Sequence, residues 1–206
     1  MHHILRRSGL ALAVTALVGT MVAATAPAQA RSATRTDAPA TYTTTIVVTD
    51  LDANGHVLAT ETYHGQPEPL GTPQTVKGSA RPLLDSGGGG LPSPSGCRTL
   101  TVTNKTSTTL GFTAFKFITE TSWCWNLKQL RTDLGSVVVR VADVDAQFRY
   151  RGLINSFNQT IDNGKRVYRQ GFFENCIAKY GCINAYYPSN DSRVYASGMW
   201  TWTTNG

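Results

Sequence analysis

The sequence predicts an all-β protein built around an antiparallel β-sandwich. From Cys97 to the C-terminus, short β-branched and aromatic segments recur between turn signals such as Asn104-Lys105 and Asn163-Gly164. No window of this region shows a helical period with caps, which argues against an α-helical or mixed fold. About seven such strands in roughly 110 residues favour a sandwich of immunoglobulin-like size, with a small barrel as the alternative.

The first thirty residues, 1–30, predict a cleaved signal peptide. A basic start with Arg6 and Arg7 precedes an uncharged apolar run, and Ala28 and Ala30 have the small-residue spacing that a signal peptidase reads. No polar stop-transfer flank follows the run, so no transmembrane anchor is expected. We therefore expect a secreted, extracellular protein, in a compartment where disulfide bonds persist.

Residues 31–64 are predicted to hold a β-hairpin. The stretch Asp50–Glu61, DLDANGHVLATE, matches the ligand positions of an EF-hand calcium loop. The segment before it is β-branched at almost every position, which disfavours the helix that such a loop needs. Asn54-Gly55 instead favours a type I′ turn that places Glu61 opposite Val48. We expect no metal site here. A lone hairpin is marginal in water, so it must dock on the main domain, bind a partner or fluctuate.

Residues 65–96 are predicted to be a flexible linker, because they contain six prolines and the run Gly87–Gly90. Residues 97–206 are predicted to be the folded sandwich domain. They hold all four tryptophans and all seven phenylalanines, which supply the apolar area of one core. They also hold thirteen Lys or Arg against seven Asp or Glu, a net charge of +6, whereas residues 31–96 have a net charge of −2.

All four cysteines lie in the predicted domain, at Cys97, Cys124, Cys176 and Cys182. In an exported protein, two disulfides are favoured over a metal site, and the cysteine spacing does not fit zinc. Three pairings are open. The gap of five residues favours a local Cys176–Cys182 bridge, which leaves Cys97 with Cys124. We expect that second bridge to connect the first strand of the domain with the WCW segment across the core.

Several motifs together resemble a family of small secreted actinobacterial proteins of unassigned function. These are WCW (123–125), DVDAQFRYRG (143–152), RQGFFENCIAKYGCI (169–183), YP (187–188) and GMWTWTTNG (198–206). The resemblance covers 97–206 and departs at Phe148, where the family often has Trp. It implies secretion and a disulfide-bearing β domain, and it supplies no catalytic residue.

The predicted domain contains no histidine, which excludes a Ser-His-Asp or Cys-His catalytic site within it. No nucleotide-binding or metalloprotease motif occurs, and we expect no catalytic residue, metal or cofactor. A pair of carboxylates is the remaining route to hydrolysis of a sugar bond. The candidates for it are Glu120, Asp143, Asp145 and Glu174.

A ligand surface is predicted from basic and aromatic residues. Arg149 and Arg151 share a face of one strand, and Arg169 joins them if the two segments are neighbouring strands. Tyr186 and Tyr187 lie beside a turn, where at least one ring is exposed. The leading hypothesis is a secreted, non-enzymatic binding protein for an anionic cell-wall polymer or glycan, with nucleic acid not expected. The alternatives are an antimicrobial or toxin-like domain and a glycan-cleaving enzyme.

Overall fold

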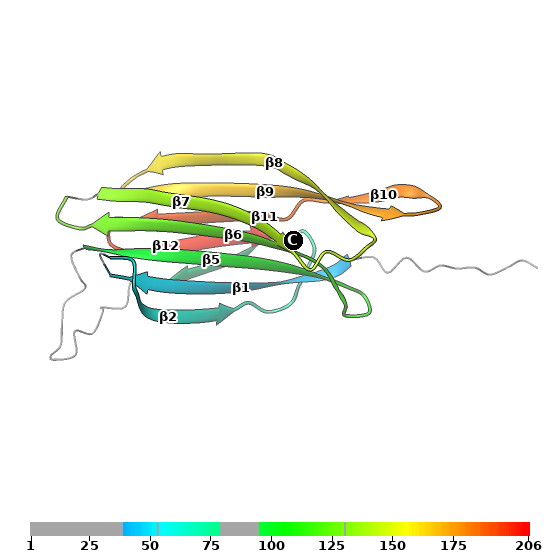
Figure 1. Ribbon diagram of the computed structural model, residues 1–206, viewed down its shortest axis with the longest axis horizontal. Coiled ribbons are helices and arrows are strands. Elements are labelled where there is room, and N and C mark those ends of the chain that lie inside the picture. Colours follow the sequence, from blue (N-terminus) through cyan, green and yellow to red (C-terminus); the bar gives the residue numbers. More distant parts are fainter. Residues whose placement is uncertain (1–38, 53, 79–94, 130) are drawn as a thin grey trace, which may run out of the picture. The chain divides into compact units, whose positions relative to one another are not determined.

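The regular structure of the described chain is entirely β-strand. The computed structural model describes residues 39–52, 54–78, 95–129 and 131–206 (Figure 1). Within those ranges no helix is long and apolar enough to cross a bilayer. The predicted signal peptide, residues 1–30, lies outside the described residues, as do residues 79–94 of the predicted linker.

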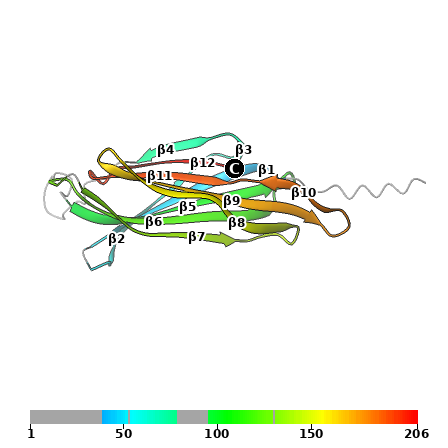
Figure 2. The same ribbon diagram turned by 90° about the horizontal axis from the view of Figure 1, so that it is seen from above.

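The strands form two antiparallel sheets, which Figure 2 shows as two layers. Sheet A has the order β2-β1-β5-β6-β7 with β3 paired to β1, and sheet B has the order β10-β9-β11-β12-β4 with β8 paired to β9. This arrangement confirms the predicted antiparallel sandwich. The strands are β1 (Pro39–Leu51), β2 (Val57–His64), β3 (Glu68–Pro69), β4 (Gln74–Gly78), β5 (Ser95–Thr108), β6 (Thr113–Asn126), β7 (Arg131–Ala142), β8 (Phe148–Ile161), β9 (Gly164–Ile177), β10 (Gly181–Tyr186), β11 (Ser189–Tyr195) and β12 (Trp200–Asn205).

The N-terminal hairpin is part of the sandwich rather than a separate segment before it. Strand β1 lies between β2 and β5, with Thr44 opposite Asn104. The alternating side chains that begin with Tyr42 and end with Val48 are buried in the core, which explains why they are apolar or β-branched. The predicted register is also correct, because Val48 pairs with Glu61. The fold therefore begins at β1, and not at Cys97 as predicted.

The predicted linker, residues 65–96, also contributes to the fold. Strand β3 pairs with β1, and β4 pairs with β12 at the edge of sheet B, with Thr75 opposite Thr203. These strands are only two and five residues long. Strands this short next to prolines occur at sheet edges, where a missing backbone donor is tolerated, and they leave almost no periodic signal in the sequence.

The core between the sheets consists of two hydrophobic clusters. The first joins both sheets and contains four tryptophans, and Trp200 and Trp202 are each 1% exposed, as their alternation predicts. The second is built around Phe115 and Phe173, whose rings stack with centroids 3.9 Å apart. Strand β6 supplies side chains to both clusters, which explains why it is 14 residues long and alternates between buried and half-buried positions.

Buried polar side chains also cross-link the two sheets. Thr44 and Thr204 bond through their hydroxyls at 2.9 Å. The Asn190 amide donates to the Thr119 hydroxyl at 2.9 Å, and the Asn104 amide donates to the Asn205 carbonyl at 3.0 Å. Each bond joins one sheet to the other, so these contacts fix the alignment of the sheets more specifically than apolar packing does.

Both predicted disulfides are confirmed, but the placement of the Cys97–Cys124 bridge differs from the expectation. Cys97 and Cys124 are directly opposed on the neighbouring strands β5 and β6, so the bridge lies within sheet A and not across the core. Cys176 and Cys182 are likewise opposed on β9 and β10. The expectation failed because WCW continues the same long β6 that pairs with β5, instead of forming a separate strand.

Candidate functional site

The outward side chains of β9 form the candidate binding site. Successive outward positions of a strand alternate with buried ones, so Arg166, Tyr168, Gln170, Phe172 and Glu174 form one row on the outer face of sheet B. The eight residue-to-residue steps from Arg166 to Glu174 span about 26 Å. We call this row the β9 track. It also includes the side chains beside the row, which are Arg149, Arg151 and Phe157 on β8, Asp191 and Arg193 on β11, and Tyr187 between β10 and β11.

Two pairs of stacked aromatic rings occupy the middle of the β9 track. Phe157 on β8 stacks on Tyr168 with centroids 5.1 Å apart and planes inclined by 16°. Phe172 stacks on Tyr187 with centroids 5.4 Å apart and planes inclined by 13°. Gln170 lies on β9 between the two pairs. Tyr187 is 46% exposed, which confirms the expectation that one ring of the Tyr186-Tyr187 pair faces solvent.

Each end of the β9 track carries two arginines and one carboxylate. At one end, Glu174 is directly opposite Arg149 on β8, and Arg151 donates to its carboxylate at 2.6 Å. The bulge between Tyr150 and Gly152 makes Arg151 the extra residue of its strand, which lets it reach back to Glu174. No described acidic side chain forms an ion pair with Arg149, so one positive charge at this end is unbalanced.

The other end repeats this arrangement. Arg166 forms a bidentate pair with Asp191, with nitrogen–oxygen distances from 2.7 to 3.1 Å. Hydrogen bonding to Asp191 raises the pKa of Arg166 above its usual value. The guanidinium also lies over the ring of Phe157, 5.2 Å from its centroid. Arg193 is exposed and directly opposite Arg166 on β11, with no acidic partner among the described residues.

Two residues of the predicted ligand surface are not on it. Strands β8 and β9 are neighbours, as the expectation required, but Arg169 is opposite Ser156 and not beside Arg149 or Arg151, and its side chain is buried and only 8% exposed. Its guanidinium donates to the carbonyls of Phe157 and Tyr168 at 2.9 and 2.7 Å, and burial lowers its pKa. Arg169 is therefore a structural residue that holds β8 to β9.

Tyr186 also packs inward, against the second hydrophobic cluster. Its ring centroid lies 6.0 Å from that of Phe148 and 6.4 Å from that of Phe115. Burial raises the pKa of Tyr186, and hydrogen bonds with Asn175 and Asn184 oppose that shift. Of the predicted surface, Arg149, Arg151 and Tyr187 are therefore exposed, whereas Arg169 and Tyr186 are not.

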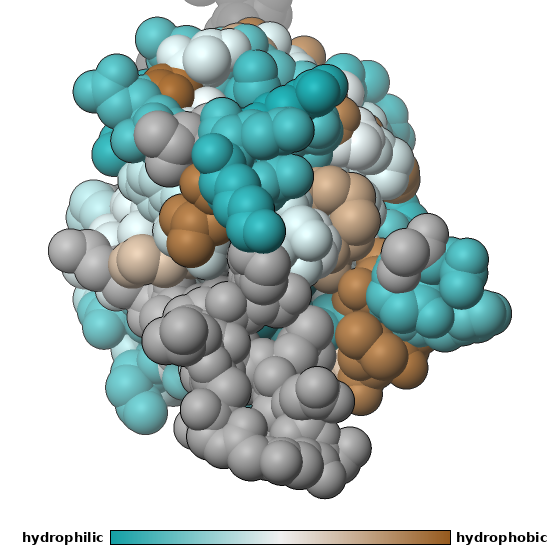
Figure 3. Space-filling model, turned by 90° about the vertical axis from the view of Figure 1, so that its left-hand side faces the viewer, coloured by the Kyte–Doolittle hydropathy of each residue, from teal (hydrophilic) through white to brown (hydrophobic). Residues whose placement is uncertain are grey.

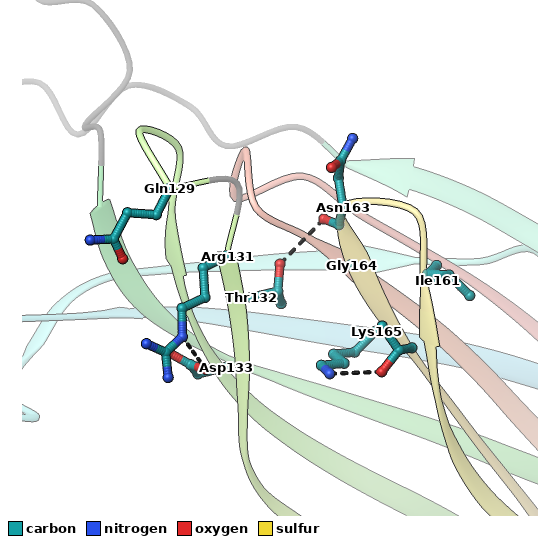
Figure 4. Close-up of a pocket in the computed structure, with 9 residues that line it drawn as sticks. Gln129, Arg131, Thr132, Asp133, Ile161, Asn163, Gly164 and Lys165 are labelled. Atoms are coloured by element: carbon teal, nitrogen blue, oxygen red, sulfur yellow. Dashed lines mark hydrogen bonds and ion pairs between the residues drawn. The ribbon is translucent and has the colours of Figure 1, made fainter.

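A second candidate is a polar pocket of about 400 Å³ at the end of the sandwich (Figure 4). It opens between the start of β7 and the β8–β9 turn, where the Thr132 hydroxyl donates to the Asn163 carbonyl at 3.3 Å. Arg131 pairs with Asp133 at 2.8 Å, and Lys165 donates to Thr160 at 2.9 Å. Because its cations already have partners, this pocket is less suited to an anionic ligand than the β9 track.

Figure 3 shows the end of the sandwich at which this pocket lies. Its described surface is mostly hydrophilic, with separate hydrophobic patches. Large apolar side chains exposed near this end include Val57, Leu58, Leu127 and Met199. Val57 and Leu58 begin β2, whereas Leu127 and Met199 line a further pocket of about 450 Å³ between the β6–β7, β8–β9 and β11–β12 connections.

The acidic side chains Asp50 and Asp52 of the calcium-loop match are engaged in other interactions. Asp50 pairs with the buried guanidinium of Arg98, which also donates to the Asp50 Oδ2 at 3.1 Å. The Asp52 carboxylate accepts from the backbone amides of Asn54 and His56, both at 2.8 Å, and so holds the turn. The flanking segments are strands, as predicted. The turn is longer than the two-residue turn expected, because a bulge lies between Asp50 and Leu51.

Each of the four candidate carboxylates is bonded to another group. Glu120 pairs with Arg140 on the outer face of sheet A, whereas Glu174 lies on the outer face of sheet B. Asp143 pairs with Lys116 at 2.5 Å, and Asp145 accepts from the Gln147 amide at 3.0 Å. Glu120 and Glu174 therefore cannot flank one glycosidic bond.

The residues of the β9 track that sequence reasoning missed are Phe157, Tyr168, Gln170, Phe172 and Arg193. The alternation of R-Y-Q-F-E at every second position from 166 to 174 was the available signal. Comparisons with protein-family models, with curated protein sequences and with solved structures each find no match to this chain.

Proposed function

We propose that this chain is a secreted, non-enzymatic binding protein that holds an anionic extracellular polymer, such as a cell-wall glycan, along the β9 track. The observation that carries the proposal is the order of groups along β9 and the segments beside it: arginines, an aromatic pair, an amide, an aromatic pair and arginines again. A linear row of this kind suits an extended chain with repeated anionic groups better than a compact small molecule.

The chemistry of each group supports this ligand class. Arginine binds carboxylates and phosphates through two parallel hydrogen bonds, and neither Arg149 nor Arg193 forms an ion pair within the described part of the chain. Arg151 and Arg166 are held in place by Glu174 and Asp191, so their orientation costs little entropy on binding. The exposed ring of Tyr187 adds an apolar surface for a sugar ring.

The protein should therefore bind acidic polysaccharides in a salt-dependent way. Retention of the protein on immobilised acidic cell-wall polymer, measured at increasing salt, tests this directly. Replacing Arg149 and Arg193 together by Gln should weaken retention about tenfold or more and flatten its salt dependence, because two attractive charges are removed. Tyr187→Ala should weaken retention without changing the salt dependence.

A matched control variant replaces two arginines of β7, which belongs to the other sheet. Arg131→Gln with Arg140→Gln removes the same number of charges outside the β9 track, and both residues are exposed. An equal loss in this variant would show that only net charge matters. No retention on any anionic polymer at low salt would overturn the proposal, and so would equal displacement by single-stranded DNA. Release of reducing sugar would favour an enzyme instead.

A further inference from the structure

Three chain connections meet at the end of the sandwich opposite the polar pocket. They are the β5–β6 turn, the β7–β8 loop and the β9–β10 hairpin, and Figures 1 and 2 both place them together. The Asp145 amide donates to the Ala114 carbonyl at 2.9 Å, which joins the first two connections. The Cys176 amide donates to the Gln147 carbonyl at 2.6 Å, which joins the last two.

Large apolar side chains project from all three connections. Leu110 and Phe112 in the β5–β6 turn are 70% and 68% exposed. Tyr180 and Ile183 in the β9–β10 hairpin are 63% and 46% exposed, and Val144 in the β7–β8 loop is 39% exposed. Several large apolar groups exposed at one end mark an interaction site more often than a single one does.

The β5–β6 turn holds its apolar side chains outward. The Thr108 amide donates to the Phe112 carbonyl at 2.8 Å, and the Gly111 amide donates to the Thr108 carbonyl at 2.9 Å. The Phe112 amide in turn donates to the Thr108 hydroxyl at 3.2 Å. Gly111 has φ of 85°, a conformation that other residues rarely adopt. Three hydrogen bonds thus hold the backbone of the turn, and Leu110 lies exposed between the residues that they join.

Lysines lie near the exposed apolar side chains of these connections, which we call the apolar tips. Lys105 and Lys116 are directly opposite each other on β5 and β6, and the former is three residues, or about 10 Å, from the end of its strand. Lys116 is neutralised by Asp143, but Lys105 has no acidic partner among the described residues. Lys179 lies over the ring of Tyr180, 5.8 Å from its centroid. The apolar tips of the β5–β6 turn and of the β9–β10 hairpin thus each have a lysine nearby that pairs with no described acidic residue, whereas the lysine beside the β7–β8 loop is neutralised by Asp143.

We propose that this end docks on an anionic phospholipid bilayer, with Leu110 and Phe112 entering the boundary between headgroups and acyl chains. Tyr180 would lie at the headgroup level, where aromatic rings with one polar atom are favoured. Lys105 and Lys179 would reach the lipid phosphates, as long basic side chains do at membrane surfaces. The tips project from the sandwich, and projecting apolar groups suit a deformable bilayer better than a rigid protein surface. The β9 track is a separate site, so both ligands could be held together.

A tryptophan introduced at position 112 tests the proposal, because its fluorescence reports on the surroundings of the β5–β6 turn. All four native tryptophans are 5% exposed or less, so their emission should not respond to vesicles. In the full-length chain with Phe112→Trp, the introduced indole should shift to the blue with phosphatidylglycerol vesicles and be quenched by brominated acyl chains. A matched variant, Leu153→Trp, changes an exposed residue of β8 and should show neither effect. Because the readout is local, binding through another part of the chain does not imitate it.

Two further outcomes decide the proposal. Lys105→Gln with Lys179→Gln should reduce the affinity for phosphatidylglycerol vesicles about thirtyfold and leave the weak affinity for phosphatidylcholine vesicles unchanged, since about 1 kcal/mol per basic residue comes from the surface potential. An indole at position 112 that stays exposed and unquenched on these vesicles would overturn the inference. A blue shift that depends on protein concentration without lipid would also overturn it, because a second copy would then cover the tips.

Discussion

The ion pair between Asp50 and Arg98 should carry much of the attachment of β1 to the sandwich. Its side chains are 14% and 4% exposed, so both charges are largely removed from water. Arg98 also donates to the Gly198 carbonyl at 3.0 Å and lies over the Trp125 ring at 5.3 Å. The guanidinium thus connects β1, β5, β6 and the β11–β12 turn.

Asp50→Ala should destabilise the fold by about 3 kcal/mol. Removing one partner of a buried pair costs roughly 3–5 kcal/mol, because the other charge stays buried without compensation. The lower end of that range applies here, since Arg98 keeps the Gly198 carbonyl and the Trp125 ring. With an m-value near 2 kcal/mol/M, the midpoint of urea unfolding should fall by about 1.5 M.

Two variants serve as controls for this prediction. Asp133→Ala breaks the Arg131–Asp133 pair, whose side chains are 57% exposed or more, and should cost less than about 1 kcal/mol. Adding Arg98→Met to Asp50→Ala should recover much of the loss, since no charge is then buried. Equal urea midpoints for Asp50→Ala and Asp133→Ala would refute the view that this pair holds β1 in place.

Three further predictions concern the turn and the bridges. Calorimetric titration should show no saturable calcium binding with Kd below about 1 mM, because Asp52 is already bonded to its own turn. A saturable heat of calcium binding that disappears in Asp52→Ala would contradict this. Hydrogen bonds from His56 lower the pKa of Asp52, so the turn should be stable above the ordinary carboxyl pKa and loosen as pH falls through the lowered value. The His56 amide resonance should follow that titration and stop doing so in Asp52→Asn. Loss of the Cys97–Cys124 bridge, which spans 27 residues, should cost about 3.5 kcal/mol, against about 2.2 kcal/mol for the Cys176–Cys182 bridge, which spans 6. Equal unfolding midpoints for the two double alanine variants would contradict the loop-entropy argument.

Local signals predicted the strands well, but not how distant strands pair. Asn54-Gly55 was enough to predict that Val48 is opposite Glu61, since a turn fixes the register of its own hairpin. The pairing of β1 with β5 joins segments about fifty residues apart across a proline-rich stretch, and no local pattern encodes it. The only sequence signal related to this pairing was the apolar and β-branched face from Tyr42 to Val48. That face indicates that β1 packs against other strands, but it does not identify them.

The same limit explains the error at Arg169. Strand alternation predicts which residues share a face, but not which of the two faces is buried. In β9 both faces carry large side chains, because Val167 and Phe173 face the core while Tyr168 and Phe172 face outward. Amino-acid composition therefore could not decide which of the two faces of β9 is buried. The outward face was defined only when the structure showed that Arg169 bonds to backbone carbonyls within the sheet.

The two outer faces of the sandwich differ in a way that favours binding on sheet B. On sheet A, the central strands present short hydroxyl side chains, with Thr45 opposite Thr103 and Thr99 bonded to Ser122. The ion pairs on that face, such as Arg140 with Glu120, are balanced one to one. On sheet B, each end of the β9 track has two arginines but one carboxylate, which pairs with only one of them, and stacked aromatic rings take the place of threonines. Threonine stabilises a solvated sheet through its β-branched shape, and stacked aromatic pairs stabilise a sheet through cross-strand packing. The arginines without an acidic partner among the described residues add no such packing, and they are the groups that the proposed anionic ligand would neutralise.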